Sequence, residues 1–168
     1  KKAGIPGPYI LVGHSFGGLT AMSILVHHSD MFNSYVAIDP SMWWDNQLLL
    51  RQTDTALRTR NFKGKTLFLS IANTMNEGMD TLQVRKDTSA NSFHIRSILT
   101  LSDYLKANAS NGLNWSYKYY NDDNHGSVPL ISEYDALHFI FKGMQFKSVG
   151  KLFDPAFTAD SSVLLVKS

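Results

Sequence analysis

The residues best suited to chemistry lie near the start of the chain, in Gly13-His14-Ser15-Phe16-Gly17. This stretch matches Gly-x-Ser-x-Gly, in which a serine occupies a strained turn between a strand and a helix and its hydroxyl is exposed above a sheet. In such a turn Ser15 would be a nucleophile, and the backbone N–H of Phe16 would donate to the oxyanion that forms during acyl transfer. We expect a side chain at either flanking glycine to collide with the adjoining strand or helix.

A serine hydroxyl needs a base, and His125 is the best placed of the chain's 6 histidines. It lies in Asn124-His125-Gly126, directly after a predicted strand and late in the chain, as the order serine, acid, histidine requires. The other histidines either adjoin Ser15 or lie in predicted helices. Together with Asp122 and Asp123, His125 offers too few ligands for a metal site.

The acid that would orient His125 has three candidates. Glu77 and Asp80 lie in the polar loop after the third predicted strand, the usual place for the acid, and Asp39 follows the second strand at the edge where ligands bind. We rank them in the order Glu77, Asp80, Asp39. A Ser-His dyad without a strong acid is a further alternative.

Apolar patterning indicates the elements that must position these residues. Short apolar or alternating runs predict four strands, and 3.6-residue periodicity predicts helices between and after them. The strands are expected at residues 9–12, 34–39, 65–72 and 114–121, and the helices at 17–28, 46–60, 92–107 and from 129 to about 142. This alternation predicts an α/β fold with a parallel sheet.

The composition restricts the classes of function. The 168 residues are enough for one domain, and a net charge of +2 provides no basic surface for nucleic acid. There is no cysteine, which excludes disulfides and thiolate chemistry, and no apolar run is long enough to span a bilayer. None of these features identifies the compartment, which could be periplasmic or cytoplasmic.

With these residues in place, the chain resembles the putative esterase family of α/β hydrolases, which includes enterochelin esterases, IroE-type siderophore esterases, S-formylglutathione hydrolase and the mycolyltransferases. The resemblance covers residues 9–143 and rests on GHSFGG, DPSMWWD and NHGSVPLISEYDALHFIF. Asp39 stands where siderophore-esterase-like members usually have serine, so it would either supply the acid or alter substrate preference.

The resemblance implies that residues 1–145 are the C-terminal portion of an α/β-hydrolase catalytic domain and that residues 146–168 are an extension or linker. It also implies that the N-terminal strands and the second oxyanion donor lie upstream, so that an upstream part of the same domain is needed. We group His14, Trp43 and Trp44 as substrate-binding candidates. Because adjacent tryptophans cannot both point into one core, at least one should line the substrate cleft.

The predicted function is a serine esterase acting on carboxylic esters, including siderophore-like lactones, through an acyl-enzyme. No metal or organic cofactor is implied, and the expected partner is a small ester. Acyl transfer to a sugar or other alcohol would use the same residues. A non-catalytic binding module with the same fold is the alternative outside enzymes.

Overall fold

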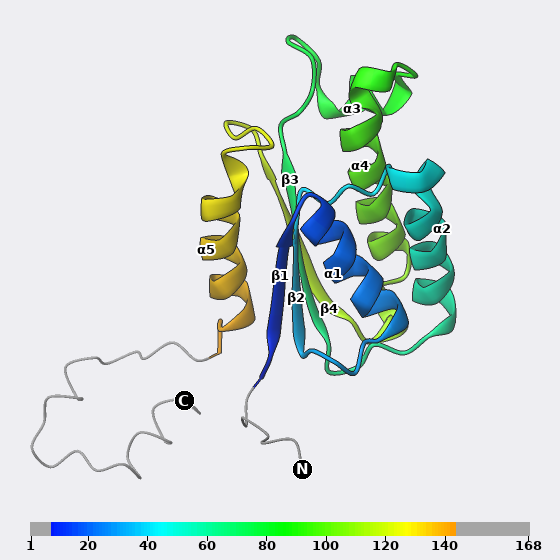
Figure 1. Cartoon of the computed structure of the whole chain (residues 1–168), viewed down its shortest axis with the longest axis vertical. Helices are drawn as coiled ribbons and strands as arrows, with labels where there is room; N and C mark the ends of the chain where they lie inside the picture. Colours follow the sequence, from blue (N-terminus) through cyan, green and yellow to red (C-terminus); the bar gives the residue numbers. More distant parts are fainter. Residues whose placement is uncertain (1–7, 144–168) are drawn as a thin grey trace, which may run out of the picture.

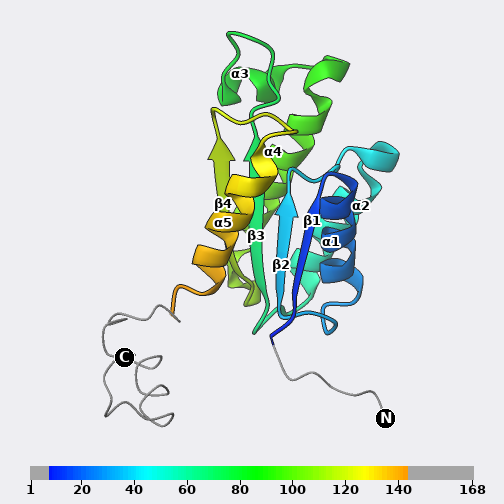
Figure 2. The same cartoon turned by 60° about the vertical axis from the view of Figure 1, so that its left-hand side comes forward.

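The computed structural model describes residues 8–143, and the predicted extension at 146–168 lies outside them. The described residues form one four-stranded parallel sheet (Figure 1), with the strands in the order β1-β2-β3-β4 (Figure 2). The strands are β1 (Ile10–His14), β2 (Ser34–Ile38), β3 (Thr66–Ala72) and β4 (Asn114–Tyr120). The register places Val12, Val36, Phe68 and Ser116 side by side. The predicted α/β class is confirmed.

Helices cover both faces of this sheet. On one face lie α1 (Phe16–His27), α2 (Trp44–Thr59) and α4 (Phe93–Ala107), and α5 (Val128–Ile140) lies on the other (Figures 1 and 2). A short helix, α3 (Thr81–Lys86), and two 3-10 turns, η1 (Ala90–Ser92) and η2 (Ala109–Asn111), complete the described elements. None of the helices within residues 8–143 has the length and apolarity needed to cross a membrane.

The core explains why a parallel sheet forms here. All five residues of β2 are buried, as expected for a central strand that is covered on both faces. The larger apolar cluster lies between the sheet and α1, α2 and α4, and a smaller one, including Val36, Phe68 and Val128, lies beneath α5.

Two local features differ from the sequence-based expectation. The loop after β3 contains α3, whose first turn is capped by Asp80. Helix α5 forms where predicted. The helical spacing of Leu130, Tyr134 and Leu137 predicts that these residues form its buried face, but they are 46–81% exposed. The face of α5 that approaches the sheet instead carries Val128, Ser132 and Ala136, which are buried, and Phe139, whose ring packs on Phe68.

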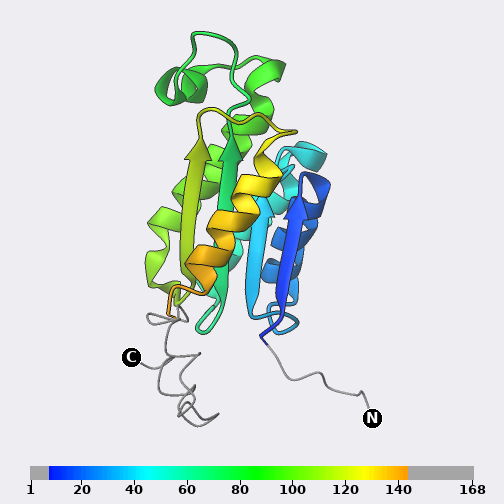
Figure 3. The same ribbon diagram turned by 90° about the vertical axis from the view of Figure 1, so that its left-hand side faces the viewer.

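The parallel strands all end at the same edge of the sheet, at the top of Figure 3. The turn after β1 and the loops after β2, β3 and β4 therefore gather there, which is where ligands bind in open α/β sheets. The candidate residues for catalysis lie on these connections.

Candidate active site

Ser15 occupies the sharp turn between β1 and α1. Its backbone has φ 58° and ψ −115°, a conformation that L-residues rarely adopt. The Ser15 N–H donates to the carbonyl of Ile38 at 3.0 Å, which ties the turn to β2. The predicted strand, strained turn and helix are therefore present.

The glycine requirement is confirmed at Gly13 but is wrong at Gly17. A Cβ at Gly13 would lie 2.1 Å from the carbonyl oxygen of Gly17, so no side chain fits there. A Cβ at Gly17 would meet no described atom within 4 Å, because that position faces outward on the first turn of α1. The second close approach is at Gly18, whose Cβ would lie 3.0 Å from Pro40.

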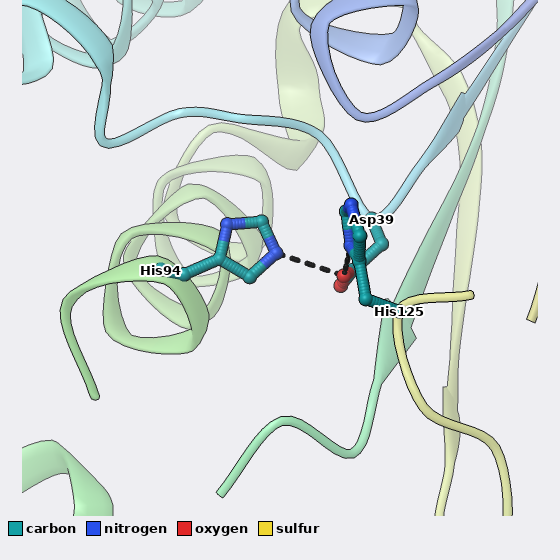
Figure 4. Close-up of side chains that lie close together, drawn as sticks. All are labelled: Asp39, His94 and His125. Atoms are coloured by element: carbon teal, nitrogen blue, oxygen red, sulfur yellow. Dashed lines mark hydrogen bonds and ion pairs between the residues drawn. The ribbon is translucent and has the colours of Figure 1, made fainter. Parts of the chain in front are cut away.

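Asp39 lies directly after β2 and contacts two histidines (Figure 4). Its Oδ2 is 2.6 Å from Nδ1 of His125 and 2.8 Å from Nε2 of His94, and its Oδ1 accepts the N–H of Ala72 at 3.0 Å. The carboxylate is fully buried. Asp39 has φ 41°, a left-handed conformation that aspartate tolerates better than most residues, and its N–H bonds to Ser70 of β3.

Hydrogen bonding keeps the buried Asp39 ionised. Burial alone would raise the pKa of this carboxyl, but the hydrogen bond and charge of His94, the hydrogen bond of His125 and the N–H of Ala72 outweigh it. The pKa of Asp39 is therefore below its usual value, and both imidazoles face a carboxylate.

His125 is held by the loop that follows β4. Oδ1 of Asn124 accepts the N–H groups of Gly126 at 2.8 Å and Ser127 at 3.1 Å, so Asn124 closes a tight turn around the histidine. The loop after β3 braces this turn, because the N–H of Asn73 donates to the carbonyl of Asp123 at 2.8 Å. The His125 side chain is 40% exposed.

The other two candidate acids lie elsewhere. Glu77 is exposed, and within residues 8–143 no hydrogen bond or ion pair joins it to His125. Asp80 accepts the N–H groups of Leu82 and Gln83 and so caps α3. The geometry thus favours Asp39, which the sequence ranked third, over Glu77, which it ranked first, because the loop bearing Glu77 turns away into α3.

A pocket of about 290 Å³ opens beside these groups, lined by Ser15, Phe16, Ser41, Trp43, His94 and His125. Oγ of Ser15 lies 3.2 Å from Oγ of Ser41, and among the described contacts no hydrogen bond joins it to His125. The N–H of Phe16 is at the first position of α1, where backbone donors have no partner within the helix.

Of the three substrate-binding candidates His14, Trp43 and Trp44, only Trp43 lines this pocket. Trp44 is 51% exposed and lines a separate groove between α1 and α2. The rings of Phe16, Trp43 and Trp44 contact one another, with centroids 5.1–6.0 Å apart. The His14 ring packs on His125 at 4.5 Å, and burial, followed by the nearby charge of His125, lowers the pKa of His14.

Asp39, His94 and His125 also offer three potential metal ligands within 4.8 Å of one another. Ligands around a tetrahedral zinc ion with bonds of about 2.0–2.1 Å would lie roughly 3.3 Å apart. The observed nitrogen-to-oxygen distances of 2.6 and 2.8 Å are those of hydrogen bonds. The arrangement is a hydrogen-bonded one, and the expectation that the chain uses no metal stays a prediction.

Two pocket residues were missed in the sequence. His94 lies on α4, and the helical periodicity that placed it there gave no sign that it faces Asp39, which is 55 residues away in the chain. Ser41 belongs to DPSMWWD, the stretch that carries the family resemblance, and this was the available signal.

Comparisons with known proteins place this chain in a family. A family model described as "Putative esterase" matches residues 3–124. The crystal structure of an IroE-like serine hydrolase from Shewanella oneidensis is 36% identical, with a TM-score of 0.68 over 81% of this chain and 40% of that one. The siderophore hydrolase EstA from Aspergillus nidulans, at 24% identity and a TM-score of 0.63, shares the fold over 80% of this chain and 48% of that one.

Curated relatives match over shorter segments. The siderophore enterobactin esterase of Emericella nidulans is 38% identical over 64 residues, which are 38% of this chain and 20% of the relative. The ferri-bacillibactin esterase BesA of Bacillus subtilis is 39% identical over 44 residues, 26% of this chain and 15% of the relative. The chain thus covers a minor part of each, and the family model, which matches most of its residues, decides the assignment. This chain belongs to the putative esterase family of α/β hydrolases.

Proposed function

We propose that this chain carries the catalytic residues of a serine esterase, with Ser15 as nucleophile, His125 as base and Asp39 as the acid that orients the base. The observation that carries the proposal is the 2.6 Å contact between Oδ2 of Asp39 and Nδ1 of His125 beside the strained turn at Ser15. Asp39 takes the place of Glu77 and Asp80 in this role. The names of the similar proteins support the esterase class.

The hydrogen bond to Asp39 determines which nitrogen of His125 acts as base. When Nδ1–H donates to the carboxylate, Nε2 carries the lone pair and can take the proton of Ser15. The hydroxyl of Ser15 contacts that of Ser41, so Ser15 would change its side-chain rotamer to reach His125. We expect this change when substrate binds, because catalytic hydrogen bonds often form only then. The Asp39 carboxylate then stabilises the imidazolium.

The reaction would follow two steps. Oγ of Ser15 attacks the ester carbonyl, the N–H of Phe16 at the start of α1 donates to the oxyanion, and protonated His125 gives its proton to the leaving alcohol. Water then attacks the acyl-enzyme and gives a proton to His125, and His125 returns that proton to Oγ of Ser15 as the bond to the acyl group breaks and the carboxylic acid leaves. The aromatic rings of Phe16 and Trp43 offer an apolar wall for the acyl or aromatic part of the substrate.

Active-site labelling of the full-length protein with a fluorophosphonate tests this mechanism. We expect one adduct on Ser15, with its rate of formation reduced at least about 100-fold in His125→Ala because the serine would lack its base. An adduct elsewhere, or one formed equally fast by His125→Ala, would refute the proposal. Product analysis with a siderophore trilactone in the presence of an alcohol separates hydrolysis from acyl transfer.

A further inference from the structure

The Asp39 carboxylate is shared by two histidines that come from different parts of the chain. His125 reaches it from the loop after β4, and His94 reaches the same oxygen from the first turn of α4 (Figure 4). The two rings stand edge to face, with centroids 5.1 Å apart and planes at 88°. A triad of serine, base and acid uses only one of these contacts, so the contact of His94 is unexplained by the proposed function.

The geometry also fixes the protons on both rings. The carboxylate accepts hydrogen bonds only, because it is ionised. Its Oδ2 therefore receives an N–H from Nδ1 of His125 and another from Nε2 of His94, while Oδ1 receives the N–H of Ala72. Three donors thus surround a fully buried group, and His94 supplies one of the two that come from side chains.

We propose that His94 is a positioning residue that holds the Asp39 carboxylate in the orientation in which its Oδ2 accepts the Nδ1–H of His125. The inference rests on the proposed esterase function. The hydrogen bond of His94 goes to the carboxylate, and among the described hydrogen bonds none joins His94 to Ser15. Its ring also packs edge to face on His125, so the test must separate an effect through Asp39 from a direct effect on the base.

The surroundings of His94 suit a fixed donor. Its side chain is only 20% exposed. The helix start that carries it is braced by Arg96, which donates to the hydroxyl of Ser92 at 2.9 Å and to the carbonyl of Ser89 at 2.9 Å. The pKa of Asp39 agrees with this role, because after the opposing effect of burial the hydrogen bond from His94 is the largest influence that lowers it.

Three variants of the full-length protein test the proposal with a nitrophenyl ester as substrate. His94→Ala removes the donor, and we expect kcat to fall about 10- to 100-fold, the loss typical of a hydrogen bond to a charged group. Because His94 also lines the pocket, KM can change as well, but by less than kcat. His94→Gln keeps a neutral N–H close to the position of Nε2, and it should restore kcat to within about fivefold of the original protein. His28→Gln, an exposed histidine at the far end of α1, is the matched control and should change nothing.

A double-mutant cycle with Asp39 decides whether His94 acts through the carboxylate. In an Asp39→Asn background, adding His94→Ala should reduce kcat less than about threefold further, because the group that His94 orients is already lost. The same loss in both backgrounds would overturn the proposal. So would a His94→Ala variant of unchanged thermal stability that keeps kcat within twofold.

Three further results distinguish failure of the positioning role from failure of the esterase mechanism and from a metal role. If Ser15→Ala and His125→Ala keep full activity, the esterase mechanism itself fails. If they abolish activity while His94→Ala does not reduce it, only the positioning role fails. Loss of activity on treatment with a chelator, restored by zinc, would overturn the inference by identifying the three residues as a metal site.

Discussion

Replacing Asp39 by asparagine is the sharpest test of how the site is built, because the change keeps the shape of the side chain and removes its charge. We expect kcat to fall about 10²- to 10⁴-fold, with 10³-fold equivalent to about 4 kcal/mol of transition-state stabilisation. KM should change little, since Asp39 is buried and does not line the pocket.

The magnitude follows from the three donors around the carboxylate. If the amide oxygen takes the place of Oδ2, the NH₂ group opposes the N–H of Ala72 and leaves a buried donor unpaired, at about 1–3 kcal/mol of stability. If the NH₂ group takes the place of Oδ2, His125 must accept with Nδ1 and carry its proton on Nε2. It can then no longer accept the proton of Ser15, so either orientation of the amide harms the site.

The assay is ester hydrolysis at pH 7.5, with rates divided by the amount of folded protein measured from its circular dichroism, so that loss of folded protein is not counted as loss of catalysis. Glu77→Gln and Asp80→Asn are matched controls, and asparagine can still cap α3. Both should keep kcat within about twofold. A tenfold loss in Glu77→Gln, together with less than a fivefold loss in Asp39→Asn, would return the acid role to Glu77 and refute the geometric argument.

Three further predictions concern the residues around the site. Gly13→Ala should destabilise the protein by about 3 kcal/mol or more in urea unfolding, because the new Cβ would lie 2.1 and 2.2 Å from backbone atoms of Gly17. Gly17→Ala has open space around the new Cβ and should be neutral or stabilising by up to about 1 kcal/mol. Equal effects of the two substitutions would contradict the structure. Burial lowers the pKa of His14 from its usual 6.5, so at acidic pH the folded state binds fewer protons than the unfolded state. The contribution of neutral His14 to the free energy of unfolding is therefore full above pH 6.5 and is lost as the pH falls toward the pKa of the folded state. His14→Phe should therefore lose less stability than the original protein between pH 7.5 and 5.5 in urea titrations, and an identical loss would show that His14 is not the group responsible. Asn124→Ala removes two hydrogen bonds from the turn that holds His125, and we expect kcat to fall about tenfold with KM unchanged; kinetics indistinguishable from those of the original protein would mean that the turn holds without them.

The elements were largely predictable because their signals are local. Apolar runs and helical periodicity located all four described strands and the four longer helices, and one glycine-rich turn located Ser15. The short helix α3 was missed because its six residues contain too little periodic pattern. Which side of α5 is buried was not evident either, since two of its three buried residues, Ser132 and Ala136, carry no strong hydrophobic signal.

The candidate site was predictable only in part. Ser15 and His125 were found from a motif and a loop position, and their catalytic roles stay predictions. The ranking of the acids relied on which loop usually supplies one, but the loops after β2 and β3 reach the same edge of the sheet. The choice depends on the left-handed backbone at Asp39 and on the turn of the Glu77 loop into α3.

The sequence by itself determined the strained serine turn, the parallel sheet and the place of His125, because each depends on the sterics or periodicity of neighbouring residues. Only the tertiary structure decided that Asp39 contacts His125, 86 residues away, and that His94 shares the carboxylate. These contacts join three segments whose relative positions are set by strand register and helix packing. Hydrogen-bond geometry is lost within an ångström or so, and no local pattern of residues encodes positions that closely.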